Sequence, residues 1–400
     1  MTEILEKEHC FPELVEWFDE LAAFRHDLHA NPELGFDTAR TCGKIVEALK
    51  SFGIEKIDSN SVEGAVFALI EGNRPGKTVA IRGDIDALPM DDGSSNAWKS
   101  TTPVRCHACG HDGHATWVLG AVRWLAAHRD FPGRVLAIFQ PAEEIGRGAK
   151  AVCDAGILEK YSVAEIYGMH DEATLPKGVI GCCKGPAQAS CDFFYVKIKG
   201  VGTHGARPHL GIDPIPAGCE LVGALQTIVS RKVNPVEKAV LSVCSVNAGR
   251  FGTANVIPGE FDLCGTVRTF NQSVREQIEA EIRRMSKSVA EASGCTAEVR
   301  YDRLTPSVNN SADAIDHFAD FVRRQFGEGH IDMSFPMTMG GEDFAEYQFK
   351  VPGCIVRFGI RDDSHTVSIH NPTFDFNDEA IPMGSTILAG LAVERLKALV

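Results

Sequence analysis

The residues best suited to chemistry form the stretch 106–114, which reads CHACGHDGH. It holds two thiols and three imidazoles among small residues. Packing alone explains one buried histidine or one free cysteine, because the first needs a hydrogen bond or two and the second behaves as a small apolar side chain. It does not explain all five together. The stretch therefore predicts a metal site.

Further donors follow other predicted strands. The candidate ligands are two residues of the cluster and three distant ones, namely Cys109, His111, Glu144, His170 and His370. This set of sulfur, nitrogen and oxygen donors suits zinc or manganese, and cobalt and nickel also accept it. Five ligands are too many for one tetrahedral ion that keeps an open position. We therefore expect two divalent ions roughly 3.5–4 Å apart that share a bridging group, either the Cys109 thiolate or a hydroxide.

Glu143 and Glu144 are adjacent carboxylates that follow an apolar run and a proline. Acidic residues are also common at solvated helix starts. After a buried strand, however, neighbouring side chains point in different directions, so one can bind metal while the other handles a proton. We assign Glu144 as a ligand and Glu143 as the general base, because a carboxylate beside a metal-activated water is the usual arrangement for hydrolysis.

Asp84 and Asp86 follow another predicted strand, 78–82. Aspartates at this place are as typical of a turn as of a functional site. In the functional interpretation Asp86 orients a ligand imidazole from behind. His107 and His114 are interpreted as supporting or structural residues.

The placement of these residues predicts the architecture. Each follows the carboxyl end of a predicted strand, where open parallel α/β sheets bind ligands. The expected strands of this part are 64–70, 78–82, 135–139, 164–168 and 354–359, and the expected helices are about 14–28, 37–51 and 115–128. We predict an α/β catalytic domain with a mainly parallel sheet and helices on both faces.

The middle of the chain has a different pattern. Predicted strands at 192–199, 239–247, 260–269 and 296–301 and helices at 214–231 and 274–292 follow the β-α-β-β-α-β order of a ferredoxin-like unit. We expect an inserted lid domain over residues 187–303. The catalytic domain then comprises 1–186 and 304–400.

Composition limits the partners. The 400 residues carry a formal net charge of −14 and no run of Lys or Arg, which argues against nucleic acid and anionic membranes. The 13 scattered cysteines suit reduced thiols. The charged N-terminus resembles no leader peptide, and no apolar stretch is long enough to span a membrane. We expect a cytoplasmic protein.

Nine motifs in order resemble the metal-dependent amidohydrolase and exopeptidase family of hippurate hydrolase, aminoacylase and the indole-acetyl-amino-acid hydrolases. The hippurate and indole-acetyl-amino-acid branch is the most similar. The motifs are RHDLHANPEL at 25–34, RGDIDALP at 82–89, HACGHDGH at 107–114, QPAEE at 140–144, GMH at 168–170, THGARPH at 203–209, NVIP at 255–258, GGEDF at 340–344 and HNP at 370–372.

The resemblance implies the five metal ligands and the base named above. It also implies that His204, from the inserted domain or from a partner subunit, stabilises the oxyanion, and that Asn255 and Arg268 hold the substrate carboxylate. The physics agrees, because an oxyanion needs a preorganised donor and a guanidinium fits a carboxylate. The chain departs from the family at Asp37, where glutamate is usual. It also departs in the loop 90–104, which we expect to border the acyl pocket.

The sequence thus predicts hydrolysis of N-acyl amino acids, a small-molecule substrate class. The resemblance also implies a homodimer or a higher homo-oligomer. One alternative is a dipeptidase or carboxypeptidase with the same two-metal machinery. Another is a metal-free thiol hydrolase that uses Cys109 with a histidine. A third is a catalytically silent metal-binding or scaffold protein, in which Glu143, His204 and Arg268 would have no purpose.

Overall fold

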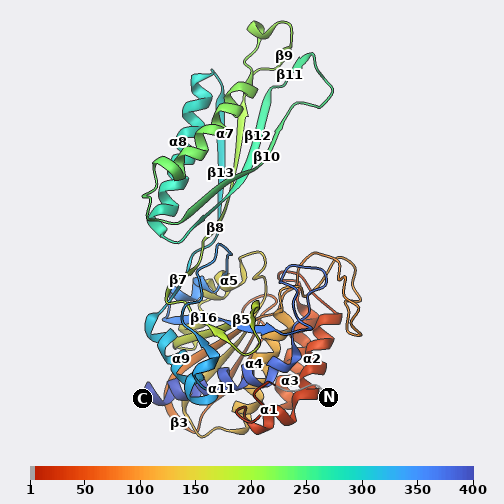
Figure 1. Cartoon of the computed structure of the whole chain (residues 1–400), viewed down its shortest axis with the longest axis vertical. Coiled ribbons are helices and arrows are strands. Elements are labelled where there is room, and N and C mark those ends of the chain that lie inside the picture. Colours follow the sequence, from red (N-terminus) through yellow and green to blue (C-terminus); the bar gives the residue numbers. More distant parts are fainter. Residues whose placement is uncertain (1–4) are drawn as a thin grey trace. The chain divides into compact units, whose positions relative to one another are not determined.

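The computed structural model describes residues 5–400 and divides them into two units (Figure 1). The first unit runs to Ala187 and also includes Asn309–Pro336 and Asp343–Val400. The second unit consists of Gln188–Val308 and Met337–Glu342.

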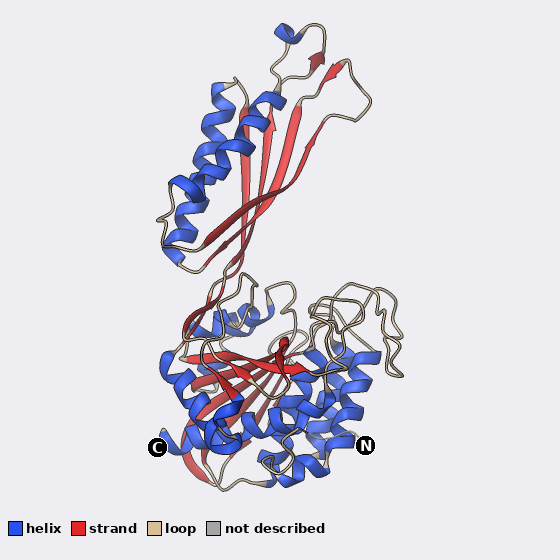
Figure 2. Ribbon diagram, in the orientation of Figure 1, coloured by secondary structure: helices blue, strands red, loops and turns tan. Residues whose placement is uncertain are grey.

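The first unit is built on a mixed sheet whose strand order is β1-β2-β4-β3-β5-β16-β6-β15 (Figure 2). Its strands are β1 (Ile57–Asp58), β2 (Val66–Glu71), β3 (Arg74–Asp84), β4 (Pro132–Gln140), β5 (Val163–Pro176), β6 (Ile180–Gly181), β15 (Ile331–Asp332) and β16 (Gly353–Arg361). The central neighbours β4, β3, β5 and β16 are parallel, whereas β2 and β6 pair antiparallel to their neighbours β4 and β16. The central strands are buried on both faces, which explains their continuous apolar runs.

Helices surround this sheet. They are α1 (Pro12–Glu16), α2 (Phe18–Ala30), α3 (Ala39–Ser51), α4 (His111–Ala127), α5 (Gly148–Asp154), α6 (Ile157–Lys160), α9 (Ala312–Phe326), α10 (Ala345–Gln348) and α11 (Ile381–Ala398), with 3-10 turns at Glu328–His330 and Asp378–Ala380. Gly83 of β3 lies against His114 of α4. Its neighbour Arg82 points to the other face and pairs with Asp343 just before α10. Helical segments therefore cover both faces.

The second unit is a four-stranded antiparallel sheet with the order β10-β12-β8-β13, covered by two helices. Its elements are β8 (Cys191–Lys199), α7 (Pro214–Arg231), β10 (Ala239–Ala248), β12 (Glu260–Thr269), α8 (Gln272–Ala292) and β13 (Thr296–Thr305). Asp213 and Asn271 cap the two helices by accepting backbone N–H groups. The apolar sides of α7 and α8 pack with alternate residues of the strands, such as Val196 and Leu263.

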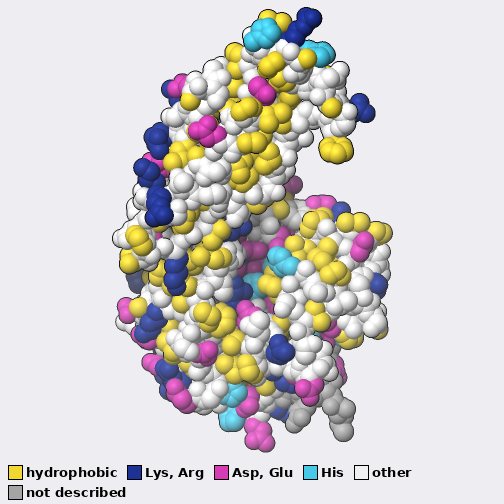
Figure 3. Space-filling model, turned by 45° about the horizontal axis from the view of Figure 1, so that its top comes forward, with side chains coloured by type: hydrophobic (Ala, Val, Ile, Leu, Met, Phe, Trp, Pro, Cys, Tyr) yellow, Lys and Arg dark blue, Asp and Glu magenta, His cyan; other side chains and the backbone are white. Residues whose placement is uncertain are grey.

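Shorter strands complete the chain: β9 (Thr203–His204) pairs with β11 (Val256–Ile257), and β7 (Gly185–Gln188) pairs with β14 (Val308–Asn310), while Pro208–Leu210 forms a 3-10 turn. The predicted fold class is confirmed: a mainly parallel α/β sheet accompanies a unit with βαββαβ order. Among the described residues, no helix is long and apolar enough to cross a membrane. On the face shown in Figure 3, acidic and basic side chains are interspersed.

Candidate metal centre

Cys109 and His111 reach the centre from the start of α4. Gly110 lies between them with φ +77°, in the left-handed region that glycine enters at little cost. A Cβ atom at Gly110 would lie only 2.3 Å from Oδ1 of Asp171. The turn therefore requires glycine, and it places a thiol and an imidazole side by side at the beginning of a helix. The expected helix start at 115 was too late, since α4 begins at His111.

The other donors come from distant parts of the first unit. Glu144 follows β4, whereas His170 lies inside β5 and not after its end. His370 follows β16 in a loop, with φ +61°, a conformation that non-glycine residues rarely adopt. The backbone N–H of His370 donates to the carbonyl of Ala108 (2.7 Å), which ties this loop to the cluster.

The structure brings all five predicted ligands together. The donor atoms of Cys109, His111 and His170 lie within 4.8 Å of one another, and so do those of Cys109, Glu144 and His370. Sγ of Cys109 lies 3.5 Å from Nε2 of His170 and 3.3 Å from Nε2 of His370. For sulfur at about 2.3 Å and nitrogen at about 2.0–2.1 Å from one tetrahedral zinc ion, the expected separation is about 3.5 Å.

The tautomers of two ligands follow from their partners. Nδ1 of His111 lies 2.8 Å from the backbone oxygen of Asp86, and Nδ1 of His170 lies 2.7 Å from that of Asp171. A carbonyl only accepts, so Nδ1 carries the proton in both rings. In the neutral ring, which is the form that binds metal, each Nε2 therefore has a lone pair.

Burial leaves donor atoms at the centre without partners. Nε2 of His111 and Oε1 of Glu144 are buried and have no hydrogen bond among the described residues. They lie 3.8 Å apart. Unsatisfied buried donors and acceptors are costly, and divalent ions would satisfy both atoms. The residues therefore fit the ions that the donor set predicts.

The pKa values of two ligands also indicate that the centre binds cations. Burial raises the pKa of the Glu144 carboxyl to about 7, although nearby His111 opposes the shift. Burial also raises the pKa of the Cys109 thiol well above its usual value. Both groups bind metal in their anionic forms, which a divalent cation stabilises.

Glu143 stands at the edge of the donor cluster, with Oε2 4.0 Å from Nε2 of His111. The carboxylate of Asp86 accepts the backbone N–H groups of Glu143 (3.0 Å) and Glu144 (3.2 Å). Asp86 thus fixes the segment that carries both glutamates through its side chain, while it orients His111 mainly through its backbone. The sequence had suggested only the second task.

A buried network lies behind the ligands. The sequence had suggested a supporting or structural role for His114, but not its partners. Nδ1 of His114 lies 2.6 Å from Asp84, and Nε2 lies 2.8 Å from Asp171. Asp84 in turn pairs with Arg82 at 2.6 Å. Asp171 had a local signal, since it directly follows the ligand His170, but its partner could not be inferred from spacing.

His204, the predicted oxyanion donor, and the two predicted substrate-binding residues Asn255 and Arg268 belong to the second unit. β9 and β11 place His204 opposite Val256, so Asn255 lies beside His204. Nδ1 of His204 accepts the backbone N–H of Ala206 (3.0 Å), which leaves Nε2 as a donor. Arg268 lies near the end of β12, which begins at Glu260. Its side chain donates to the backbone oxygen of Val267 (3.1 Å).

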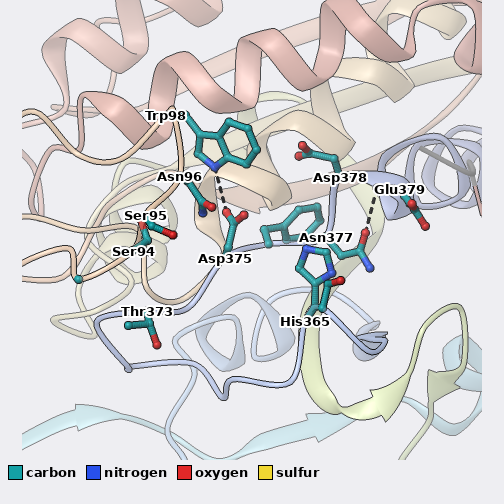
Figure 4. A pocket seen from close by; sticks show the side chains of 13 residues that line it. Ser94, Ser95, Asn96, Trp98, His365, Thr373, Asp375, Asn377, Asp378 and Glu379 are labelled. Atoms are coloured by element: carbon teal, nitrogen blue, oxygen red, sulfur yellow. Dashed lines mark hydrogen bonds between the residues drawn. The ribbon is translucent and has the colours of Figure 1, made fainter. Parts of the chain in front are cut away.

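A cavity of about 480 Å³ in the first unit lies between the loop 93–98 and the segment that follows the ligand loop (Figure 4). Its wall includes hydroxyl, amide and carboxylate side chains. Nε1 of Trp98 donates to Oδ1 of Asp375 at 3.2 Å, and the Trp98 ring stacks on His26 with centroids 3.7 Å apart. The loop is thereby held against α2 and the C-terminal segment.

Comparisons with known proteins agree with this site. Residues 80–394 match the profile of a family described as Peptidase family M20/M25/M40. The chain is 38% identical to N-acetylcysteine deacetylase of Bacillus subtilis, over 93% of this chain and 96% of that protein. It is 33% identical to hippurate hydrolase of Campylobacter jejuni, over 97% of this chain and 100% of that protein. A crystal structure described as a dinuclear metal binding peptidase of the M20 family, from Bacillus subtilis, matches with a TM-score of 0.83 and 35% identity, over 96% of this chain and 99% of that one.

Proposed function

Because the chain belongs to the peptidase family M20/M25/M40, we propose that it is a metal-dependent amidohydrolase that cleaves N-acyl amino acids into a carboxylic acid and a free amino acid. Two relatives whose names describe such reactions align over nearly its whole length. The observation that carries the proposal is the meeting of five donor side chains from separate segments, with the carboxylate of Glu143 at their edge.

The ligands Cys109, His111, Glu144, His170 and His370 would hold two divalent ions, zinc or manganese in the first place, with cobalt and nickel as further candidates. When bound, such ions polarise the substrate carbonyl and lower the pKa of water. The remaining chemistry belongs to side chains of the protein.

Glu143 acts as the general base and then as the general acid. Its carboxylate takes a proton from the attacking water as the new C–O bond forms. It returns that proton to the amide nitrogen as the C–N bond breaks, so that the amine leaves neutral. His204 donates to the oxyanion, while Arg268 and Asn255 hold the carboxylate of the amino acid. Second units act as lids that bring these donors to the substrate.

His204 and Arg268 are too far apart within one chain to serve one small substrate together. Arg268 lies eight residues along β12 from Glu260, and Glu260 pairs with Lys199, which precedes His204. At about 3.3 Å per residue this part of the sheet alone spans about 26 Å. We therefore propose a homodimer in which His204 and Asn255 act on the substrate of the partner subunit.

Mixing two inactive variants tests this arrangement. Glu143→Gln and His204→Ala should each be inactive alone. In a mixed dimer, the chain that keeps Glu143 receives His204 from its partner, so refolded equimolar mixtures should regain about a quarter of wild-type activity if chains pair at random. If the mixture is as inactive as the separate variants, His204 acts within its own chain.

A dipeptidase or carboxypeptidase with the same centre is the second candidate, since a solved neighbour is described as a peptidase. A substrate panel separates the two. Metal-free protein is reconstituted with zinc, manganese, cobalt or nickel and assayed on aromatic and acetyl amino acids and on dipeptides. Higher kcat/KM for the acyl amino acids supports the proposal. Preference for dipeptides favours the peptidase, and no turnover of any compound by metal-loaded protein favours a scaffold.

We place the enzyme in the cytoplasm. Each of the thirteen cysteines is a free thiol in the structure, and several are buried. Free thiols in this number are typical of reducing compartments.

A further inference from the structure

A second group of metal-type donors lies outside the centre described above. It consists of His29 in α2, Asp92 in the loop after β3 and Cys106 in the segment before α4. One donor atom from each lies within 4.8 Å of the other two, and all three residues are buried. None of them is among the five ligands of the proposed dinuclear centre.

The hydrogen bonds of His29 leave one nitrogen facing this group. Nδ1 of His29 lies 2.8 Å from Oδ2 of Asp112, which also accepts from Nη1 of Arg25 at 3.0 Å. Nε2 of His29 is buried and has no hydrogen bond among the described residues. When the ring is protonated, Nε2 is at ion-pair distance from Asp92. When it is neutral, Asp112 holds Nδ1–H and Nε2 turns its lone pair to the group, which is the usual arrangement behind a metal-binding histidine.

The separation of two of the donors fits a small divalent ion. Nε2 of His29 lies 3.4 Å from Oδ2 of Asp92. Nitrogen and oxygen ligands at about 2.0–2.1 Å from a tetrahedral ion lie about 3.3–3.4 Å apart. Asp92 is held in place by the backbone N–H groups of Ser94 and Ser100, each at 2.8 Å.

His107 adds a second observation that points to a ligand. Its ring is 1% exposed, and both of its nitrogens are buried without a hydrogen bond in the described part of the chain. The ring centroids of His107 and His29 are 6.2 Å apart. Such an imidazole is costly to bury unless something binds it.

We propose that His29, Asp92 and Cys106 form a third metal site that takes a zinc-like divalent ion, with His107 as the neighbouring imidazole that completes its coordination. A thiolate, an imidazole and a carboxylate are the donors that zinc prefers, and a closed set of this kind is typical of structural sites. The ion would join α2 to both ends of the loop 92–106. Trp98 of this loop, labelled in Figure 4, stacks on His26 of α2.

Metal counting tests the site. Purified protein is loaded with zinc, desalted and analysed for ions per chain by mass spectrometry. The wild type should hold three ions, and Cys106→Ser and Asp92→Asn should each hold two. Cys182→Ser, which changes a buried thiol elsewhere in the unit, should hold three. The ion count does not depend on turnover. The third site can therefore be disproved while the proposed activity stands, and the activity can be disproved while the third site stands.

Two ions per chain in both the wild type and Cys106→Ser would overturn the site, as would a third ion that persists in Cys106→Ser and Asp92→Asn. If Cys106→Ser does not fold, Asp92→Asn supplies the same comparison. A second readout is cobalt loading in a Cys109→Ser background. A thiolate-to-cobalt absorption band should persist there and disappear when Cys106→Ser is added.

Discussion

Nε2 of His114 lies 2.8 Å from Oδ1 of Asp171, and the opposite nitrogen of the same ring lies 2.6 Å from Oδ1 of Asp84. One buried imidazole thus joins the end of β3 to the interior of β5. Asp171 also accepts Nδ1–H of His170 through its backbone oxygen. His114 therefore helps to position the metal ligand His170, through Asp171 and through an edge contact between the two rings, whose centroids lie 4.6 Å apart.

His114→Gln should lower metal affinity about 10–100-fold, because an amide cannot span both carboxylates and the residues behind metal ligands usually matter to this extent. Competition with a chromogenic chelator measures the affinity. Trp117→Phe is the matched control, since Trp117 stacks on His114 at 5.3 Å and is equally buried. It should lower the melting temperature without changing the affinity. Equal metal affinity in His114→Gln and the wild type would contradict the positioning role.

Glu143→Gln should reduce kcat by about 10²–10⁴-fold or more, because the amide cannot accept a proton from water. Its metal content should stay at the wild-type level, since Glu143 is not a ligand in our assignment. Steady-state kinetics and metal analysis on the same sample check both statements. Glu71→Gln, at the end of β2, should keep wild-type kinetics. A Glu143→Gln enzyme within tenfold of wild type would remove the proposed base.

The sequence predicted the donors and suggested Asp86 and His114 as supporting residues, but it did not predict the contacts through which they act. Cys109 and His111 could be recognised because a cluster of thiols and imidazoles is chemically distinctive, and Glu144 because it follows an apolar run. His170 was expected after its strand, yet β5 continues to Pro176 because it pairs with β16 along that length. Such pairing depends on residues almost 200 positions away, which no local pattern contains.

The supporting residues were hidden for a related reason. Asp171 and His29 are ordinary polar residues in their own segments, and their roles arise only when β3, β5, α2 and α4 pack together. Composition and periodicity describe one segment at a time. They do not reveal which buried polar groups share hydrogen bonds across segments.

Gly110→Ala should weaken metal binding strongly. Its φ of +77° and the 2.3 Å approach of a Cβ atom to Asp171 mean that the turn between Cys109 and His111 must shift. Strain in the left-handed region alone costs of order 1–3 kcal/mol. Gly223→Ala is the control, because nothing lies within 4 Å of its added Cβ and it lies inside α7. It should be neutral or stabilising by up to about 1 kcal/mol. Metal titration measures the affinity of both variants, and thermal melting measures their stability.

Chelation should abolish turnover, and zinc, manganese, cobalt or nickel should restore it. The 3.3 Å contact between Cys109 and His370 would also suit a thiol hydrolase, so geometry alone does not separate the two mechanisms. A thiol enzyme would keep its activity after dialysis against a chelator, whereas the metal enzyme should lose at least about 99%. Dialysis without chelator is the control. The melting temperature should fall with the metal, because an ion that binds only the folded state stabilises it.

Glu165→Gln should destabilise the protein at neutral pH and matter less in acid. Arg395 binds both oxygens of Glu165, at 2.8 and 2.9 Å, and Tyr167 donates to one of them at 2.9 Å. Burial by itself would raise the pKa of Glu165, but these donors outweigh burial and lower the pKa below its usual value. A lowered pKa in the folded state means that the pair stabilises fully above the unfolded pKa of about 4.3, and that this contribution is lost as the pH falls through the folded value.

The E165Q variant should therefore be less stable than the wild type by about 3 kcal/mol at pH 7, since it leaves a mostly buried guanidinium without its carboxylate. The difference should stay constant down to about pH 5 and shrink below about pH 4. Melting temperatures of both proteins across this range measure it. Glu47→Gln, an exposed position in α3, should follow the wild-type curve. A gap between E165Q and the wild type that persists unchanged at low pH would mean that packing around Glu165, and not its charge, provides the stability.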